Sequence, residues 1–381
     1  MRKDLTLTSF LANKKQWLLI AALINLLFIQ AKAQTDSLDK MLGQMLMLGF
    51  RGTSITDTNQ IVKDIKNLGI GGVILFEYDS PSSSRPRNIQ SESQLQALTA
   101  ALQKKASIPL FIGIDQEGGM VNRLKTRYGF PRSVDAQYLG NLDNPDTSRF
   151  YAQRTATTLA NLGINVNFAP VLDVNINPAC PVIGKIKRSF SEKPERVAQE
   201  AAIVYHAQQN EGVVSVYKHF PGHGSALADS HLGFTDVSHT WKQKELNPYK
   251  ILLKQGLCDA VMTAHVFNSQ LDSLWPGSLS NQTIDQLLRK QLGWQGVVFS
   301  DDMMMGAITD NYSLEEAIKH ALLAGVDVLV FSNNIKTYDP AIASKAAACI
   351  KKLVNEGQIP WSVITNSYLR ILKLKSKYHL L

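Results

Sequence analysis

Two acidic residues, Asp301 and Asp302, directly follow the apolar segment 296–300. A pair of carboxylates at the end of a buried strand is costly unless partners satisfy it, so it needs a chemical or structural reason. Side chains alternate along a strand, and we therefore expect one carboxylate to point into a site at the strand end. A carboxylate in that position could act as a nucleophile or bind a metal. Asp302 could instead cap the segment 303–308.

The segment 218–231 carries five titratable side chains among prolines and glycines, namely Lys218, His219, His223, Asp229 and His231. A loop of this composition is typical of a functional site. Asp229 stands two residues before His231, and a carboxylate at that spacing can orient an imidazole and raise its basicity. The alternative is that the two are surface residues that never touch. For His223, which lies between two glycines, we expect a buried structural histidine.

Two mechanistic classes fit these residues. In the first, Asp301 attacks the anomeric carbon of a sugar and His231, steered by Asp229, protonates the leaving oxygen. In the second, His219, His223, His231 and a carboxylate hold a divalent metal that activates water. The sequence has no Gly-x-Ser-x-Gly elbow and no glycine-rich phosphate loop, which argues against a serine hydrolase and a nucleotide-binding enzyme.

The elements that must position these residues alternate between strand and helix. Near-continuous apolar runs, typical of parallel strands buried on both faces, occur at residues 45–50, 72–76, 110–114, 166–170, 213–217, 260–264, 297–300 and 327–331. Helical patterns lie between them, at 56–68, 92–106, 146–162, 194–209, 248–255, 281–292, 317–324 and 340–354. Eight such repeats predict a single (β/α)8 TIM-like barrel of the α/β class, with an open doubly wound sheet as the alternative. In such a barrel the polar residues that follow the strands meet at one end.

Composition excludes several other classes of protein. The chain has 381 residues, of which 45% are hydrophobic and 19% charged, so it is neither disordered nor a polytopic membrane protein. Its three cysteines cannot form a disulfide framework, and we expect buried free thiols. Of the net charge of +8, residues 1–33 contribute half, and the remainder has no basic block, so no nucleic-acid partner is expected.

The N-terminus has the pattern of an export signal. Basic residues precede the apolar run 17–29, and Ala31-Lys32-Ala33 offers a small-residue cleavage site. We therefore predict a signal peptide at residues 1–33, cleavage after Ala33, and a periplasmic or secreted bacterial protein whose catalytic barrel spans residues 34–381. If the leader were not cleaved, it would act as a membrane anchor.

The segment Lys218-His-Phe-Pro-Gly-His-Gly224, followed by Asp229-Ser-His231, resembles the signature of β-N-acetylglucosaminidases in glycoside hydrolase family 3. Segments similar to 115–119, 261–265 and 300–302 occur there in the same order, so the resemblance covers about residues 38–375. It implies a single barrel, with no cofactor, that acts as a retaining exo-β-N-acetylglucosaminidase. We expect a monomer.

The resemblance also implies roles for individual residues. Asp301 would be the nucleophile, His231 the acid/base and Asp229 its partner. The groups that bind the terminal N-acetylglucosamine would be Asp115, Arg123, Arg188, Lys218 and His219. Peptidoglycan fragments are the first expected substrate and chitin oligosaccharides the second, with either water or phosphate as the glycosyl acceptor. A cell-wall glycan-binding protein without activity is the alternative from another class.

Two of the departures from the family pattern concern the expected sugar-binding residues. Met120 stands where the family usually has arginine, although Arg123 remains at the later position. The turn Gly184-Lys-Ile-Lys-Arg188 is about two residues longer and more basic than usual, which bears on where Arg188 lies. Near the C-terminus, Lys373, Lys375 and Lys377 are expected on a solvated helix face.

Overall fold

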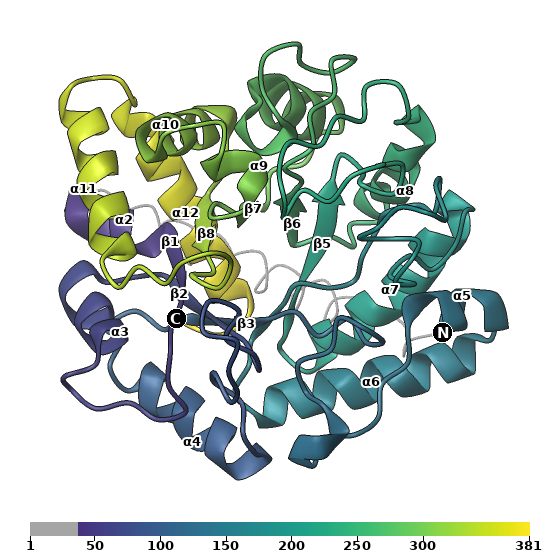
Figure 1. Ribbon diagram of the computed structural model, residues 1–381, viewed down its shortest axis with the longest axis horizontal. Helices are drawn as coiled ribbons and strands as arrows, with labels where there is room; N and C mark the ends of the chain where they lie inside the picture. Colours follow the sequence, from purple (N-terminus) through teal and green to yellow (C-terminus); the bar gives the residue numbers. More distant parts are fainter. Residues whose placement is uncertain (1–36) are drawn as a thin grey trace, which may run out of the picture.

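Eight parallel strands close into a barrel, each paired with its neighbours in chain order and β8 paired with β1 (Figure 1). The computed structural model describes residues 37–381, so the predicted signal peptide lies outside the described residues. The strands are β1 (Leu46–Gly49), β2 (Gly72–Leu75), β3 (Phe111–Ile114), β4 (Val166–Asn167), β5 (Val214–Phe220), β6 (Ala260–Thr263), β7 (Val297–Asp302) and β8 (Val328–Phe331). The closed order confirms the predicted barrel and excludes the open sheet.

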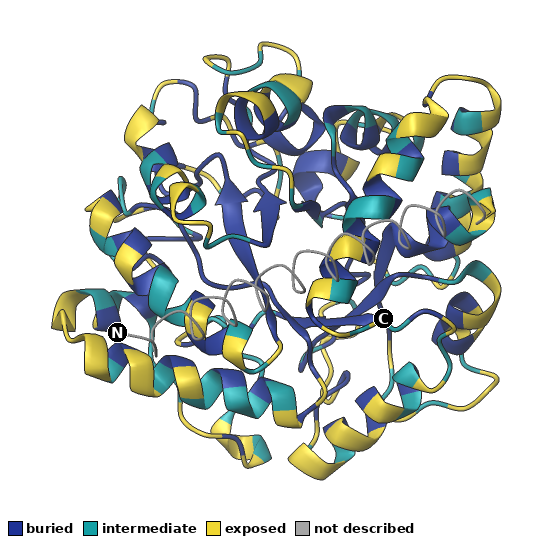
Figure 2. Cartoon of the chain, turned by 180° about the vertical axis from the view of Figure 1, so that it is seen from behind, coloured by how far each residue is buried: buried dark blue, intermediate teal, exposed yellow. Residues whose placement is uncertain are grey.

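Helices surround the barrel, and each of the eight predicted helical segments contains one. The α-helices are α2 (Leu38–Gln44), α3 (Gln60–Lys63), α4 (Glu92–Gln103), α5 (Ala136–Leu142), α6 (Pro145–Asn161), α7 (Pro194–Asn210), α8 (Asn247–Lys254), α9 (Gly306–Thr309), α10 (Leu314–Ala324), α11 (Ile342–Asn355) and α12 (Trp361–Lys377). Two segments are π-helical, η1 (Asp64–Leu68) and η5 (Gln282–Gln291). Viewed from behind, the strands are buried and the outward faces of the helices are exposed (Figure 2).

The helix ends follow the local sequence. The capping box predicted before α10 is present: Glu316 N donates to Ser313 Oγ at 3.2 Å, and Ser313 N donates to Glu316 Oε2 at 3.0 Å. The same helix ends at Gly325, whose φ of +111° is open to glycine and strained for other residues. These two signals fix where the chain turns from α10 into β8.

Side chains fill the inside of the barrel. The ring of Phe299 lies 5.6 Å from Phe168 and 6.0 Å from Phe111, measured between ring centroids. Gly113 leaves room for this packing, because a Cβ atom there would lie 2.4 Å from Met47 Cε. The interior is therefore a packed core, and a ligand can enter only at an end of the barrel.

Two strands run further than the sequence predicts. β5 continues to Phe220 and β7 to Asp302, and each has a register shift near its end, between Tyr217 and Phe220 and between Phe299 and Asp302. Lys218, Asp301 and Asp302 are therefore held on strands and not in loops, with a local irregularity that re-aims their side chains.

Part of the expectation for the C-terminal lysines is wrong. Lys373 and Lys377 are exposed, but Lys375 is fully buried at the end of the barrel where the strands begin. Its Nζ donates to Gln44 Oε1 at 2.7 Å, and to the carbonyl oxygens of Pro109 at 2.6 Å and Gly71 at 3.1 Å. The sequence predicts a solvated side chain because the partners of Lys375 come from distant parts of the chain.

Two further observations concern the cysteines and membrane-spanning helices. All three cysteines are free thiols, as expected, but only Cys180 is fully buried, and Cys258 and Cys349 are partly exposed. Within residues 37–381, no helix has the length and apolar character needed to cross a membrane.

Candidate active site

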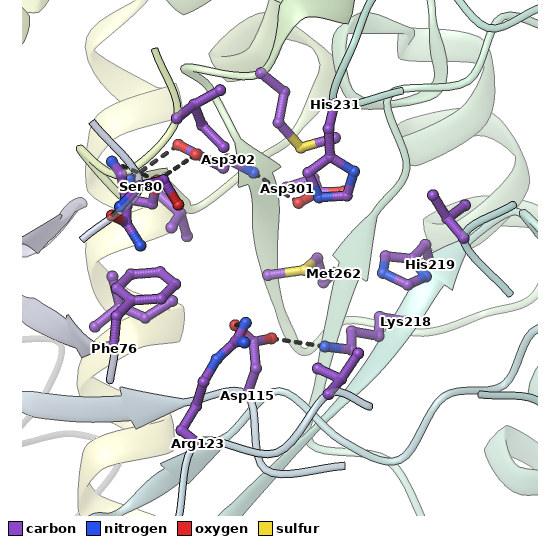
Figure 3. A pocket seen from close by; sticks show the side chains of 18 of the residues that line it. Phe76, Ser80, Asp115, Arg123, Lys218, His219, His231, Met262, Asp301 and Asp302 are labelled. Atoms are coloured by element: carbon purple, nitrogen blue, oxygen red, sulfur yellow. Dashed lines mark hydrogen bonds and ion pairs between the residues drawn. The ribbon is translucent and has the colours of Figure 1, made fainter. Parts of the chain in front are cut away.

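A cavity of about 390 Å³ opens at the end of the barrel where the strands finish. It is lined by all eight residues that the sequence analysis assigns to the site, namely Asp115, Arg123, Arg188, Lys218, His219, Asp229, His231 and Asp301. They come from segments that follow or end β3, β4, β5 and β7, so closure of the barrel brings them together. Figure 3 shows Asp301 beside His231, with Asp115, Arg123 and Lys218 below them in that view.

His231 and Asp229 form a pair in the loop after β5. His231 Nδ1 lies 2.7 Å from Asp229 Oδ1, and the backbone N–H of His231 donates to the same oxygen at 2.8 Å. Partial removal from water lowers the pKa of His231, but the hydrogen bond to Asp229 and the charges of Asp301 and Asp229 outweigh this and raise it overall. The pair leaves Nε2 free, so the imidazole can exchange a proton with a bound ligand.

Asp301 points into the cavity, and Asp302, which also lines it, is held by hydrogen bonds from the protein. Burial raises the pKa of Asp301, but the charges of His265, His219 and His231 outweigh it and lower the pKa. Asp302 is buried and accepts hydrogen bonds from Ser332 N at 2.9 Å and Met304 N at 3.1 Å. Strand alternation thus separates the two carboxylates as expected, and burial raises the pKa of Asp302 to about 6.

Asp302 also connects the ends of three strands. Its backbone N–H donates to Asp301 Oδ1 at 2.8 Å, and its carbonyl oxygen accepts from His265 Nε2 at 2.9 Å, beyond the end of β6. Its side chain binds Ser332, beyond the end of β8. Asp302 therefore holds one oxygen of Asp301 and leaves the other available. Asp302 therefore does more than cap the segment 303–308, as proposed from the sequence, because it also links the ends of neighbouring strands.

Opposite the Asp301 carboxylate, Asp115 binds two cations. Lys218 Nζ donates to Asp115 Oδ1 at 2.7 Å, and Arg123 Nη2 lies 3.5 Å from Oδ2. Burial raises the pKa of Asp115, but the charges of Lys218 and Arg123 outweigh it and lower the pKa. The guanidinium of Arg123 lies 5.5 Å above the ring of Phe76, which also lines the cavity. The group offers both donors and acceptors to a polar ligand.

Glu117, to which the sequence analysis gave no role, does not line the cavity but binds two residues that do. It receives Arg188 in a bidentate pair, with Nε at 2.8 Å and Nη2 at 2.7 Å, and it lies 2.6 Å from Lys218 Nζ. Burial raises the pKa of Glu117, but Arg188 and Lys218 lower it to about 2. The longer basic turn does not displace Arg188, because Glu117 anchors it. The sequence does place two acidic residues, Asp115 and Glu117, within three positions after a strand, and this pair could have indicated a role for Glu117.

His219 and His223 are held by Asp173, a polar residue that follows β4 and to which the sequence assigns no role. Asp173 Oδ2 lies 2.6 Å from His219 Nδ1, and its Oδ1 accepts from the backbone N–H of His223 at 2.8 Å. His223 is buried, its Nε2 lies 3.0 Å from Ser230 Oγ, and burial lowers its pKa to about 4. These are the surroundings expected of a structural histidine.

The placement of the three histidines does not support the metal alternative. His219 is paired with Asp173, His223 with Ser230 and His231 with Asp229, so their rings serve different partners. Over the described part of the chain, no three His, Cys, Asp or Glu side chains are grouped in a way that could hold a metal ion. The geometry favours a carboxylate and an imidazole acting directly on the ligand.

Comparison with known proteins gives a consistent result. Residues 37–374 match the family model of the glycosyl hydrolase family 3 N-terminal domain. The chain is 35% identical to Beta-hexosaminidase A of Pseudoalteromonas piscicida, over 89% of this chain and 61% of that protein. It is also 35% identical to a Beta-hexosaminidase of Nitrosomonas eutropha, over 78% of this chain and 83% of that protein.

Solved structures agree with these sequence matches. A glycoside hydrolase family 3 beta-N-acetylglucosaminidase from Paenibacillus superposes with a TM-score of 0.82 at 34% identity, covering 91% of this chain and 63% of that one. A Beta-N-acetylhexosaminidase from Beutenbergia cavernae gives a TM-score of 0.77 at 28% identity, covering 90% and 99%. The chain thus spans about three fifths of the Pseudoalteromonas and Paenibacillus proteins.

Proposed function

This chain belongs to glycosyl hydrolase family 3, and from that premise we propose that it is an exo-acting β-N-acetylglucosaminidase. The observation that carries the proposal is the convergence of Asp301 and the Asp229–His231 pair on one cavity. A carboxylate nucleophile and an imidazole of raised pKa are the two groups that a retaining glycosidase needs, with histidine in place of the second carboxylate.

The first half-reaction would form a glycosyl-enzyme. A carboxylate oxygen of Asp301 attacks the anomeric carbon while the bond from that carbon to the leaving oxygen breaks. His231 donates its Nε2 proton to the leaving oxygen, and Asp229 stabilises the imidazolium before the transfer and holds Nδ1 protonated afterwards. The raised pKa of His231 supports this role, because it favours the protonated form that donates the proton.

The second half-reaction would restore the enzyme. A water molecule attacks the anomeric carbon, and His231, now neutral, takes its proton. The bond from the anomeric carbon to Asp301 breaks, and the carboxylate returns with its low pKa. The sugar leaves with the configuration it had in the substrate, since two displacements occur at one carbon.

The remaining polar groups would hold the terminal sugar. Asp115, Lys218, Arg123 and Arg188 supply fixed donors and acceptors for hydroxyl and amide groups, and their ion pairs keep them in place without the ligand. Phe76 adds an apolar surface on the same wall of the cavity. A neutral sugar rich in hydroxyl groups matches this lining.

For the natural substrate we propose peptidoglycan fragments that end in N-acetylglucosamine. The support is the export pattern in residues 1–33, which predicts a periplasmic or secreted enzyme in contact with cell-wall material. Chitin oligosaccharides are the second candidate.

The test is release of an aryl group from an aryl β-N-acetylglucosaminide by the wild type, Asp301→Ala and His231→Ala, each with and without a chelator. We expect activity that resists the chelator and falls about 10³-fold or more in Asp301→Ala. Loss of wild-type activity to the chelator would instead support the metal class. Folded wild type that binds glycans without cleaving them would support a binding protein.

A further inference from the structure

Arg87, in the loop after β2, has a fully buried side chain whose donors all point to the protein. Its Nε donates to the carbonyl oxygen of Phe50 at 3.0 Å, and its Nη1 donates to Asn334 Oδ1 at 2.8 Å. Its Nη2 donates to two carbonyl oxygens, that of Asn333 at 2.9 Å and that of Ser332 at 3.2 Å. Four uncharged oxygens therefore bind the planar fork of this guanidinium.

The pairing of Arg87 with a carboxylate is loose by comparison. Its Nη1 lies 3.5 Å from Asp79 Oδ1, and the same oxygen accepts from Arg51 Nη2 at 3.1 Å. Burial lowers the pKa of Arg87 to about 10, so the guanidinium is still charged at neutral pH. A buried charge held mainly by uncharged oxygens is costly, which indicates that the bonded segments need a fixed position.

The oxygens that Arg87 binds lie where the barrel closes. Phe50 directly follows β1 and Ser332 directly follows β8, and these first and last strands pair with each other. The carbonyl oxygen of Ser332 approaches β1 so closely that a Cβ atom at Gly49 would lie 1.7 Å from it. Arg87 therefore joins the loops after β1, β2 and β8 at the end of the barrel that carries the cavity.

The turn after β8 has a backbone conformation that needs such an anchor. Asn333 has a φ of +54°, in the left-handed region that few residues other than glycine adopt. Arg87 Nη2 binds the carbonyl oxygens of Ser332 and Asn333, which belong to the two peptide groups that flank Asn333. A conformation of this kind persists where the surroundings hold it from several sides, so loss of the guanidinium should let the turn relax.

The same turn leads to the proposed nucleophile. Ser332 N donates to Asp302 Oδ1 at 2.9 Å, and the Ser332 hydroxyl also binds the Asp302 carboxylate. The backbone N–H of Asp302 in turn donates to Asp301 Oδ1 at 2.8 Å. Arg87 itself does not line the cavity, whereas Ser332, Asp302 and Asp301 do. Any effect of Arg87 on a bound ligand must therefore pass through this chain of contacts.

We propose that Arg87 is a positioning residue for the nucleophile: it fixes the turn 332–334, the turn holds Asp302, and Asp302 aims Asp301 at the anomeric carbon. The proposal rests on the β-N-acetylglucosaminidase function proposed above, in which Asp301 is the nucleophile. A displacement of about 1 Å can slow a reaction of this kind about 100-fold, so Arg87 acts on kcat more than on KM. The alternative is an arginine that only stabilises the closed barrel, which predicts unchanged turnover by the folded enzyme.

The first test separates turnover from binding and from stability. Arg87→Lys keeps a positive charge but cannot reach Phe50 and the turn 332–334 together, and Arg87→Met removes the charge and all the donors. With the aryl β-N-acetylglucosaminide, we expect kcat per folded molecule to fall about tenfold in Arg87→Lys and about 100-fold in Arg87→Met. KM should stay within about threefold of the wild type. Urea unfolding gives the folded fraction of each variant under assay conditions.

Arg289→Lys is the matched control at the other end of the barrel. Arg289 is also a buried arginine, and its Nη1 and Nη2 donate to the carbonyl oxygens of Gly296 at 3.1 Å and Gly325 at 2.7 Å. These glycines lie just before β7 and before β8, far from the strand ends that carry the cavity. The control should lose stability, as the Arg87 variants do, and keep kcat per folded molecule.

A double-mutant cycle tests whether Arg87 acts through Ser332. Ser332→Ala removes the hydroxyl that binds Asp302 and should lower kcat about tenfold. If the contacts form one chain, adding Arg87→Lys to Ser332→Ala should bring the total loss to about 20-fold, well below the product of about 100-fold that independent effects would give.

Unchanged kcat in both Arg87 variants, an equal loss of kcat in Arg289→Lys, or multiplicative effects in the cycle would each overturn the positioning role. If Arg87→Met does not fold, Arg87→Lys and the cycle decide. A folded wild type that does not cleave the aryl substrate would show that the proposed function is wrong. Crystal structures of the wild type and Arg87→Lys then decide the positioning role: a displaced Ser332 with a lost Asp302–Asp301 contact supports it, and an unmoved turn overturns it.

Discussion

At the scale of single residues, the site separates the roles of groups that the sequence presents side by side. Asp301 and Asp302 are neighbours, yet charges of surrounding histidines lower the pKa of the first, while burial raises the pKa of the second to about 6. Environment therefore distinguishes the two carboxylates, and residue type alone does not. The same principle applies to His231, whose raised pKa depends on Asp229.

The substitution Asp229→Asn should shift the pH dependence of the reaction. The new amide could still accept a hydrogen bond from His231 but would carry no charge, so the pKa of His231 falls. Because the acid must be protonated, the alkaline limb of kcat/KM moves to lower pH, and kcat drops by about 10- to 1000-fold. The check is a pH profile with the aryl substrate, with Asp146→Asn, an exposed carboxylate on α6, as control. An unmoved alkaline limb would contradict the role given to Asp229.

At the scale of elements, the sequence predicts where strands lie better than where they end. Apolar runs identify all eight strands, but β5 and β7 continue through Lys218 and Asp302 because partners from other parts of the chain satisfy these charges. Polarity normally marks the end of a buried strand, so this extension is invisible without the tertiary contacts. The same reason explains why the sequence does not predict the contacts of Glu117, Asp173 and Lys375: each is held by residues far away in the chain.

Glu117, which follows β3, joins Arg188 in the loop after β4 to Lys218 on β5, and this predicts a defined effect of its loss. In Glu117→Ala, the buried Arg188 loses its bidentate carboxylate partner, and Lys218 keeps Asp115. We expect the free energy of unfolding to fall by about 3–5 kcal/mol, with a smaller loss in Glu117→Gln. Because Arg188 is also expected to bind the sugar, KM for the aryl substrate should rise in both variants more than kcat falls.

A matched control for this prediction is Glu200→Gln. Glu200 is also buried, but it lies on α7, its nearest cation is Arg196 at 3.6 Å, and burial raises its pKa. Losing this charge should change stability little and leave KM unaltered. The two variants are compared by urea unfolding and by KM and kcat. Equal KM values for wild type and Glu117→Gln would show that Glu117 does not position the sugar-binding groups.

At the scale of the whole molecule, the two ends of the barrel have different tasks. The end where the strands finish carries the cavity and its charged groups, with ion pairs that are open to solvent or to a ligand. The opposite end carries α12. Its Lys375 binds Gln44, Gly71 and Pro109, which lie just before β1, β2 and β3. Such a division predicts that changes at the closed end alter stability without altering catalysis.

Lys375→Met tests this division through pH. Burial lowers the pKa of Lys375 to about 7, far below that of a lysine in the unfolded chain, so between about pH 7 and 10 the unfolded state binds more protons. As the pH increases over that range, the free energy of unfolding of the wild type should therefore rise by about 1 kcal/mol per pH unit relative to that of Lys375→Met. Urea unfolding at several pH values measures this difference, and the exposed Lys373→Met serves as control. Parallel stability curves would mean that Lys375 keeps its charge in the fold, and a fall in kcat would mean that the two ends of the barrel are coupled.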